Sequence, residues 1–379
     1  MKLVKLTWAR YGIPFRAPFY TAHGTLSLRS GALVAVSTDE GITGYGEIAP
    51  LPDHSGQDLD ASLQALPHLA RTLHNRALPE ILRLLDSLNT DDQLPAALIC
   101  GLESALLDAC GKALNVRVAD VLTRDYPSCT GVSRASLPAR VPVNAVISGS
   151  TTAAAVASAQ AALKAGFTCL KLKLFNASPA ALARVAAVRA AIGPTPRLRL
   201  DANAAWESAP ARRLLAQCAS YDIEYVEQPL AADDLAGMAA LRRVSPVPLA
   251  ADEALTGLAS ARRILQSRAA DVLILKPQLA GGLRTCRRIV QEACAQGVAC
   301  VITSTLEAGF GVAAALHLAA ASPEVTTPCG LATLDLLEDD LLQDGLRLQQ
   351  GTLELPAAPG LGVLLDQAAY HRFSAEQLI

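Results

Sequence analysis

The sequence is poor in charge, in aromatic residues and in histidine. Of its 379 residues, 18% are charged and 4% are aromatic, and the formal net charge is -2. No block of five or more like charges occurs. The chain therefore lacks the basic surface that binding to nucleic acid or to a charged membrane requires.

Signals for secretion, membrane insertion and disulfide bonding are also missing. The first fifteen residues carry three positive charges and no continuous apolar run, so we expect no signal peptide. The apolar stretch 94–114 contains three charged residues, which predicts a buried helix rather than a membrane crossing. Nine cysteines are scattered without CxxC spacing, which is typical of reduced thiols in a cytoplasmic protein.

Two kinds of functional motif are absent from the second half of the chain. No histidine lies between His74 and His317, which argues against a histidine base or a zinc site in that region. The glycine-rich patterns GxGxxG and GxxxxGK[ST] do not occur, which argues against a nucleotide-binding sheet.

What the sequence does have is enough apolar material for a large core. Hydrophobic residues make up 51% of the chain. Residues 1 to about 50 alternate as antiparallel strands do, with a predicted hairpin turn at Asp39, Glu40 and Gly41. Apolar residues at three- and four-residue spacings then predict helices near 60–75, 78–88 and 94–114. A sheet followed by helices indicates an α+β domain.

From Val141 onward, strands alternate with alanine-rich helices. We predict strands at 141–147, 168–175, 197–203, 223–229, 247–253, 271–277 and 298–304, and a weaker eighth near 329–334. The helix at 178–193 has Ser178 as N-cap, Pro179 at its first position and Gly193 as C-cap. Seven or eight such units over about 200 residues favour a TIM-type (β/α)7β barrel.

These patterns give a two-domain α/β chain. We predict an α+β capping domain over 1–125, with a C-terminal segment at about 352–379 packing back on it. The (β/α)7β-barrel catalytic domain is predicted over 135–350.

Charged residues recur near the end of one predicted strand after another. In chain order these residues are Lys171, Lys173, Asp201, Glu227, Asp252 and Lys276, followed by the hydroxyl pair Ser304 and Thr305. The three carboxylates are 26 and 25 residues apart, which is one βα unit each. Because the carboxyl ends of barrel strands share one face, these side chains are expected on one rim.

Three carboxylates that close together need a compensating cation. Oxygen ligands without histidine or thiolate favour Mg²⁺. The lysines on either side could act as bases, and we expect Lys171, Lys276 and the metal to lower the pKa of Lys173. Such a site suits proton abstraction next to a carboxylate, with the metal stabilising the enediolate.

The same residues lie in motifs that resemble the enolase superfamily, in its muconate-lactonizing-enzyme subgroup. These motifs are KLK at 171–173, DANAAW at 201–206, EQPL at 227–230, ADEA at 251–254 and KPQLAGG at 276–282. The resemblance implies that Asp201, Glu227 and Asp252 are metal ligands for Mg²⁺, with Mn²⁺ able to substitute. It also implies acid/base roles for Lys173 and Lys276 on opposite faces of the substrate. Lys171 and Asn203 would then act as an accessory lysine and a supporting side chain.

Three further stretches resemble the o-succinylbenzoate synthase family. They are GEIAPLPDHS at 46–55, TSTLEAGFG at 303–311 and GLATLDLLEDDL at 330–341. This resemblance implies Mg-dependent syn-dehydration of 2-succinyl-6-hydroxy-2,4-cyclohexadiene-1-carboxylate, a step of menaquinone and phylloquinone biosynthesis. Lys173 would remove the proton α to the carboxylate, while Lys276 stays protonated. The expected partner is thus a small carboxylate substrate, and homo-oligomerisation is left open.

Other reactions remain as alternatives. Dipeptide epimerases carry an Asp-x-Asp pair at the eighth strand end, where this chain has Gly330-Leu331-Ala332-Thr333, which weakens that interpretation. N-succinylamino acid racemization is harder to set aside, because related enzymes handle both succinyl substrates. A Schiff-base aldolase using Lys173 or Lys276 and a non-catalytic barrel are weaker, since neither needs three carboxylates.

Further side chains are assigned provisionally to substrate or to packing. Tyr20, in a loop that could close over the barrel mouth, is a candidate substrate contact, as are Ser304 and Thr305. Glu307 could contact substrate or cap the helix that begins near Ala308.

Three residues near the motifs are predicted to be structural. Glu253 should point to the face opposite Asp252 and form a salt bridge, because neighbouring strand residues alternate. Trp206 and His317 are expected to pack in the core.

Overall fold

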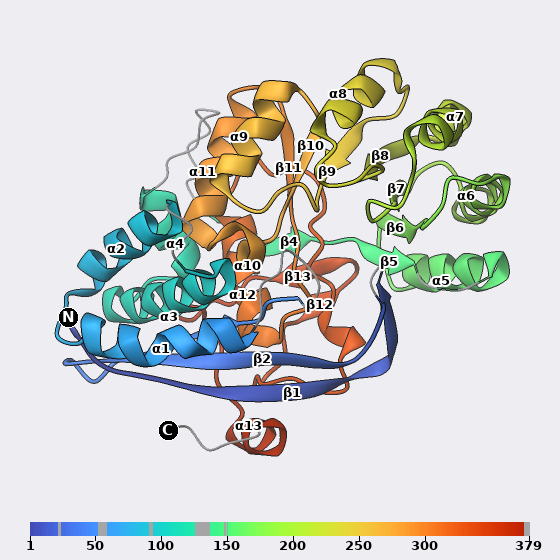
Figure 1. The fold of residues 1–379 in the computed structure, drawn as a ribbon. Helices are drawn as coiled ribbons and strands as arrows, with labels where there is room; N and C mark the ends of the chain where they lie inside the picture. Colours follow the sequence, from blue (N-terminus) through green and yellow to red (C-terminus); the bar gives the residue numbers. More distant parts are fainter. Residues whose placement is uncertain are drawn as a thin grey trace.

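The computed structural model describes residues 1–21, 24–51, 59–90, 94–125, 137–147, 149 and 151–374. In Figure 1 the sheet that contains β1 and β2, with its helices, lies against one side of a larger strand-and-helix domain. Among the described residues, no helix is long and apolar enough to cross a membrane.

The N-terminal sheet is antiparallel and covered by helices. Its strands are β1 (Leu3–Thr21), β2 (Gly24–Thr38) and β3 (Thr43–Ile48), paired in the order β1-β2-β3. The helices are α1 (Leu59–Leu73), α2 (Leu78–Thr90), α3 (Ala96–Leu114) and α4 (Val118–Asp125). The predicted hairpin and three helices are confirmed, whereas α4 was not predicted.

Two glycines let α3 approach β3 closely. A Cβ atom at Gly44 would lie 2.1 Å from the carbonyl oxygen of Ala105, and one at Gly46 would lie 2.0 Å from that of Gly101. Because real side chains cannot tolerate such contacts, only glycine fits between the sheet and the helix here.

The second half forms a curled parallel sheet, as the sequence predicts. Seven strands pair in chain order: β5 (Ala145–Ile147), β6 (Cys169–Lys173), β7 (Arg197–Asp201), β8 (Ile223–Glu227), β9 (Leu249–Ala251), β10 (Val272–Leu275) and β11 (Ala299–Ile302). The weak eighth strand is reduced to isolated bridges, Val143 with Cys329 and Thr303 with Gly330. These bridges join the two edges of the sheet and close the barrel.

Helices surround this barrel on its outer side (Figure 1). They are α5 (Thr152–Lys164), α6 (Pro179–Ile192), α7 (Ser208–Cys218), α8 (Leu235–Val244), α9 (Leu258–Ser267), α10 (Pro277–Ala280), α11 (Leu283–Cys294) and α12 (Gly309–Ala320). The Ser178 hydroxyl accepts a hydrogen bond from Ala181 N, and Gly193 ends α6 at φ 74°, so the predicted caps are confirmed.

The end of the chain returns to both parts of the molecule. β4 (Arg140–Pro142), β12 (Leu348–Gln349) and β13 (Thr352–Glu354) form a small sheet. α13 (Gln367–Phe373) packs against β1, and Ser374 bridges to Tyr11. The boundaries at 1–125, 135–350 and 352–379 stay a prediction.

Candidate active site

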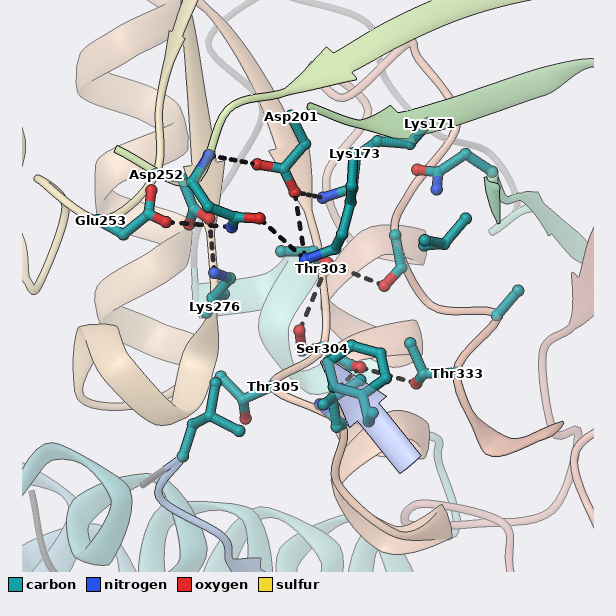
Figure 2. A pocket seen from close by; sticks show the side chains of 18 residues that line it. Lys171, Lys173, Asp201, Asp252, Glu253, Lys276, Thr303, Ser304, Thr305 and Thr333 are labelled. Carbon is teal, nitrogen blue, oxygen red and sulfur yellow. Dashed lines mark hydrogen bonds and ion pairs between the residues drawn. The ribbon is translucent and has the colours of Figure 1, made fainter. Parts of the chain in front are cut away.

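A pocket lies at the carboxyl ends of the barrel strands, where the sequence places its charged residues. Its charged lining consists of Lys171, Lys173, Asp201, Asp252, Glu253 and Lys276. Figure 2 shows Lys173 and Lys276 pointing toward the carboxylates from different sides. Lys171 and Lys276 are 105 residues apart in the chain, and yet their charges meet in one cavity.

Strand register places the carboxylates next to one another. Asp201 pairs with Lys173 on one side and with Glu227 on the other. Asp252 follows β9, and its backbone N–H donates to Gln228 Oε1 at 3.0 Å. Asp201, Glu227 and Asp252 are each at most 2% exposed. Burial of three carboxylates is costly unless cations lie beside them.

The backbone just beyond the strand ends is strained. Asn203, Ala204 and Gln228 have φ values of 47°, 58° and 35°, in the left-handed region that favours glycine. Leu306, beyond the end of β11, has φ 66°. Such conformations gather at functional sites, where the surrounding structure holds them.

Each lysine of the pocket faces a carboxylate. Lys171 Nζ lies 3.0 Å from Glu227 Oε1 and 3.1 Å from Asp201 Oδ2. Lys276 Nζ lies 2.7 Å from Asp252 Oδ2. Lys173 Nζ is less tightly held, at 3.8 Å from Asp201 Oδ2. Lys173 is therefore the lysine with the least direct carboxylate pairing of the three.

These pairs shift the protonation of the site. Burial would lower the pKa values of Lys171 and Lys276, but the neighbouring carboxylates raise them, that of Lys171 well above its ordinary range. Burial and the Asp201 carboxylate raise the pKa of Glu227 to about 8. Although burial opposes it, Lys171 and Lys173 lower the pKa of Asp201 to about 2. The lysines thus favour the ionised form of Asp201, whereas burial and the Asp201 charge favour the protonated form of Glu227.

The donor set fits a divalent cation, although the side chains are not gathered around one point. Within the described ranges, no group of three or more histidine, cysteine, aspartate or glutamate side chains is arranged to hold a metal. The carboxylates face lysine ammonium groups instead. Asp252 Oδ1, however, is buried without a hydrogen-bond partner. A free carboxylate oxygen beside two other carboxylates is chemistry that suits Mg²⁺.

Glu253 corrects a sequence expectation. It lines the same pocket as Asp252 instead of pointing to the opposite face, because β9 ends at Ala251 and strand alternation no longer applies. Asn203 Nδ2 donates to Glu253 Oε1 at 3.2 Å, and Lys173 Nζ donates to Asn203 Oδ1 at 3.0 Å. Asn203 therefore connects Glu253 to Lys173. The resemblance implied that Asn203 is a supporting side chain, but it did not identify these two partners.

The hydroxyl residues lie on the pocket wall as expected. Ser304 and Thr305 line the pocket, and the Ser304 and Thr333 hydroxyl oxygens are 2.7 Å apart. Thr305 Oγ1 is buried without a hydrogen-bond partner. A bound substrate could supply that partner. The side chain of Tyr20 lies outside the described residues.

Glu307 lies behind this wall. It is 1% exposed, and its Oε2 accepts the Thr305 N–H at 2.6 Å. Glu307 was predicted either to contact substrate or to cap α12. The N-terminus of α12 is instead capped by Glu47, which accepts hydrogen bonds from the N–H groups of Ala308 and Gly311 at 2.8 Å each.

Packing roles expected for two aromatic rings are confirmed. Trp206 is 5% exposed and donates through Nε1 to Leu174 O at 2.8 Å. His317 is fully buried, where Ala119 N donates to Nδ1 at 3.2 Å.

One aromatic contact at the site was not predicted. The Phe19 ring centroid lies 5.6 Å from Lys173 Nζ, and Phe19 lines the pocket. Its neighbour Tyr20 was singled out by its loop composition, but no pattern in β1 distinguishes Phe19 from a core residue.

Comparison with known proteins agrees with this geometry. Residues 154–369 match the family model "Enolase C-terminal domain-like", and residues 4–123 match "Mandelate racemase / muconate lactonizing enzyme, N-terminal domain". The L-Ala-D/L-Glu epimerase of Bacillus subtilis is 30% identical, over 96% of this chain and 97% of that protein. The o-succinylbenzoate synthase of Thermobifida fusca is 37% identical, over 61% of this chain and 72% of that protein.

A solved structure extends the comparison to a metal. The dipeptide epimerase of Enterococcus faecalis, complexed with Mg and the dipeptide L-Leu-L-Tyr, has a TM-score of 0.88 and 27% identity. The match covers 96% of this chain and 99% of that one. With both family models and the fold in agreement, this chain belongs to the mandelate racemase/muconate lactonizing enzyme family of the enolase superfamily.

Proposed function

We propose that the protein is a magnesium-dependent o-succinylbenzoate synthase. The observation that carries this proposal is the approach of Lys173 to Asp201 and of Lys276 to Asp252, two carboxylates of the same pocket, from the separate strand ends of β6 and β10. Two lysines beside a divalent-cation site suit proton removal α to a carboxylate.

Asp201, Glu227 and Asp252 are the side chains that would hold Mg²⁺. When bound, the cation would supply positive charge for the electrons that move onto the substrate carboxylate as the α proton leaves. Lys171 adds a second positive charge beside Asp201 and Glu227.

Lys173 is the proposed base, and it is suited to moving a proton. Its Nζ is held by the Asn203 amide oxygen at 3.0 Å and by no carboxylate within 3.5 Å among the described residues. In the proposed dehydration, Lys173 takes the α proton and returns it to the departing hydroxyl on the same face, so that water leaves. Lys276 keeps its proton and stabilises the anion from the other face.

The uncharged part of the pocket supports a succinyl substrate rather than an ammonium-bearing one. Gly330, Ala332 and Thr333 line the pocket where β11 meets the closing bridges, and Leu306 lines it nearby. None of the four carries a carboxylate that could form an ion pair with an ammonium group. The likeness to the Thermobifida fusca enzyme, quoted above, points the same way.

Racemization or epimerization is the second candidate, because it uses both lysines as bases. The placement of lysines on two sides of the carboxylates (Figure 2) fits a proton removed from one face and returned on the other. The Bacillus subtilis relative is named for such an activity.

The proposal is tested by ultraviolet detection of o-succinylbenzoate formed from the cyclohexadiene substrate. We expect product with Mg²⁺ or Mn²⁺ and none in excess EDTA. Absence of product with Mg²⁺, or full activity in EDTA, would reject the dehydratase. Faster α-proton exchange of N-succinylamino acids than dehydration would favour the racemase.

A further inference from the structure

Gln278, two residues after Lys276, holds the edge of an N-terminal strand. Its Nε2 donates to Glu47 O at 2.8 Å, and its Oε1 accepts from Ala49 N at 3.0 Å. Gln278 is 2% exposed, so both bonds are made away from water. Leaving the backbone groups of Glu47 and Ala49 unpaired there would be costly. One side-chain amide therefore joins the barrel to the end of β3.

Gln278 and Lys276 lie on the same rigid turn. The Lys276 carbonyl accepts the N–H groups of Leu279 and Ala280, each at 2.9 Å, and so begins α10. A displacement of Gln278 must therefore move the backbone of Lys276 with it.

Two other contacts fix the residues that follow α10. Asn89 of α2 donates to Gly281 O at 3.1 Å. Glu103 of α3 accepts the Arg284 N–H at 3.2 Å, at the start of α11. Gly282 allows this approach, because a Cβ there would lie 2.3 Å from Glu103 Oε2. Residues 276–284 are thus hydrogen-bonded to the N-terminal domain at three points. Within this segment, α10 lies beside α3 (Figure 1).

Lys173 is followed by a segment that is held differently. Leu174 donates to Asp201 O at 2.7 Å and accepts from Trp206 Nε1 at 2.8 Å, both within the barrel. Over the part of the chain that the structure describes, no hydrogen bond joins residues 174–178 to residues 1–125. Phe175, in this segment, is 41% exposed.

We propose that Gln278 is a positioning residue that couples Lys276, and not Lys173, to the docking of the N-terminal domain. The segment that Gln278 holds also contributes to one wall of the pocket. Arg29, buried in β2, donates to the carbonyl oxygens of Ala49 and Pro50 and, at 2.9 Å, to that of Leu306. Leu51, the next residue after Pro50, lines the pocket. Movement of the N-terminal domain is therefore transmitted to the backbone at Lys276. Phe19 of β1 contacts Lys173 at its side chain instead, with the ring centroid 5.6 Å from Nζ.

The coupling itself is tested without any substrate, by hydrogen–deuterium exchange on the full-length protein. Gln278→Leu removes both bonds with little change in volume, and Trp206→Phe removes the bond that holds Leu174. We expect Gln278→Leu to speed exchange about tenfold in 276–284 and to leave 174–178 unchanged, because local opening rises when its hydrogen bonds are lost. Trp206→Phe should give the reverse pattern. Unchanged exchange in 276–284, or an equal rise in both segments, would overturn the proposal.

The kinetic consequence rests on the second candidate function, racemization, in which each lysine acts as a base on its own face of the substrate. In D₂O, α-proton exchange is measured for each enantiomer of an N-succinylamino acid, and Lys173→Ala and Lys276→Ala show which lysine serves which enantiomer. We expect Gln278→Leu to lower the kcat of the Lys276-dependent exchange about tenfold more than that of the Lys173-dependent exchange. Gln278→Glu, which keeps the acceptor for Ala49 N, should recover part of this loss.

The two experiments separate failure of the function from failure of the coupling. Equal losses for both enantiomers in Gln278→Leu, beside unchanged melting temperature, would contradict selective positioning of Lys276. If the wild-type protein exchanges neither enantiomer, the acid/base function is wrong for these substrates. The hydrogen–deuterium exchange of residues 276–284 and 174–178 then tests the coupling without the kinetic assay.

Discussion

Lys173 and Lys276 differ in what surrounds them, and different roles are proposed for them. Lys276 lies 2.7 Å from Asp252 Oδ2, whereas Lys173 is held chiefly by the Asn203 amide. A strong carboxylate partner keeps a lysine protonated. At the scale of single residues, this difference assigns the base to Lys173 and the stabilising cation to Lys276 in the dehydration.

Replacing either lysine should remove most of the activity. We expect Lys173→Ala to lower kcat about 10²- to 10⁴-fold, the range for loss of a general base. Lys276→Ala should lower kcat about 10²- to 10³-fold, the range for loss of a group that stabilises the developing anion. Lys164→Ala, at the exposed end of α5, is the matched control and should leave kcat unchanged. Steady-state dehydration assays measure all three. Retention of kcat in Lys173→Ala would exclude this lysine as the base.

Mg²⁺ affinity should rise with pH because of Glu227. In the metal-free protein its pKa is raised from 4.5 to about 8, so the folded chain holds a proton that the unfolded chain releases. The protonated Glu227 therefore contributes to the free energy of unfolding. This contribution is fully present below pH 4.5 and is lost as the pH rises through about 8. A bound cation needs the ionised carboxylate, so its Kd should fall by up to about tenfold per pH unit below pH 8.

This dependence is measured by Mg²⁺ titration at pH 6.5, 7.5 and 8.5. The Glu227→Gln variant, which has no proton to release there, should bind Mg²⁺ weakly and without this slope. A Kd for the wild type that does not change with pH would contradict the assignment of Glu227 as a ligand.

At the scale of elements, the N-terminus of α12 depends on a residue from the other domain. Glu47 of β3 accepts the N–H groups of Ala308 and Gly311, and burial raises its pKa to about 7. Since this value lies above the ordinary 4.5, the stabilising protonated form is lost as the pH rises from 4.5 through 7.

Glu47→Gln should therefore flatten the pH dependence of stability. We expect it to cost about 1 kcal/mol at low pH, because one hydrogen bond is lost. Between pH 5 and pH 8 its melting temperature should fall less than that of the wild type. Thermal unfolding followed by circular dichroism measures both slopes, and identical slopes would show that Glu47 does not titrate in this range.

Sequence patterns predict the regular elements well and the contacts between domains poorly. Alternation, helical spacing and the Ser178 and Gly193 caps locate strands and helices because those signals are local. Glu253 was placed on the wrong face because the end of β9 cannot be seen in the residues themselves. The partners of Glu47 and Gln278 lie more than 200 residues away, so no local pattern reveals them.

The charged residues proposed for the site could be predicted for a different reason. Lys173, Asp201, Glu227, Asp252 and Lys276 are charges in strand ends that are otherwise apolar, and their spacing by one βα unit repeats around the barrel. Neutral pocket residues such as Phe19 and Thr333 carry no such contrast with their neighbours, and only the structure reveals them.

At the scale of the whole molecule, two domains and one cation are expected to be stabilised together. The three buried carboxylates gain a counter-charge when Mg²⁺ binds, so the folded state should gain about 2.7 kcal/mol when Mg²⁺ is present at one hundred times its Kd. The melting temperature should rise with Mg²⁺ concentration and fall in EDTA. Asp252→Asn should lose most of this response, and an equal response in that variant would argue against a site at Asp252.

The central claim is that Lys173 removes the α proton of a carboxylate substrate bound in this pocket, while Lys276 keeps its proton and stabilises the anion. A side-by-side assay of dehydration and of N-succinylamino acid racemization on the purified enzyme, with and without Mg²⁺, tests it most directly. The account predicts Mg²⁺-dependent dehydration that both lysine variants lose, with racemization slower or absent. Neither reaction with Mg²⁺ present, or either reaction undiminished in both lysine variants, would contradict it.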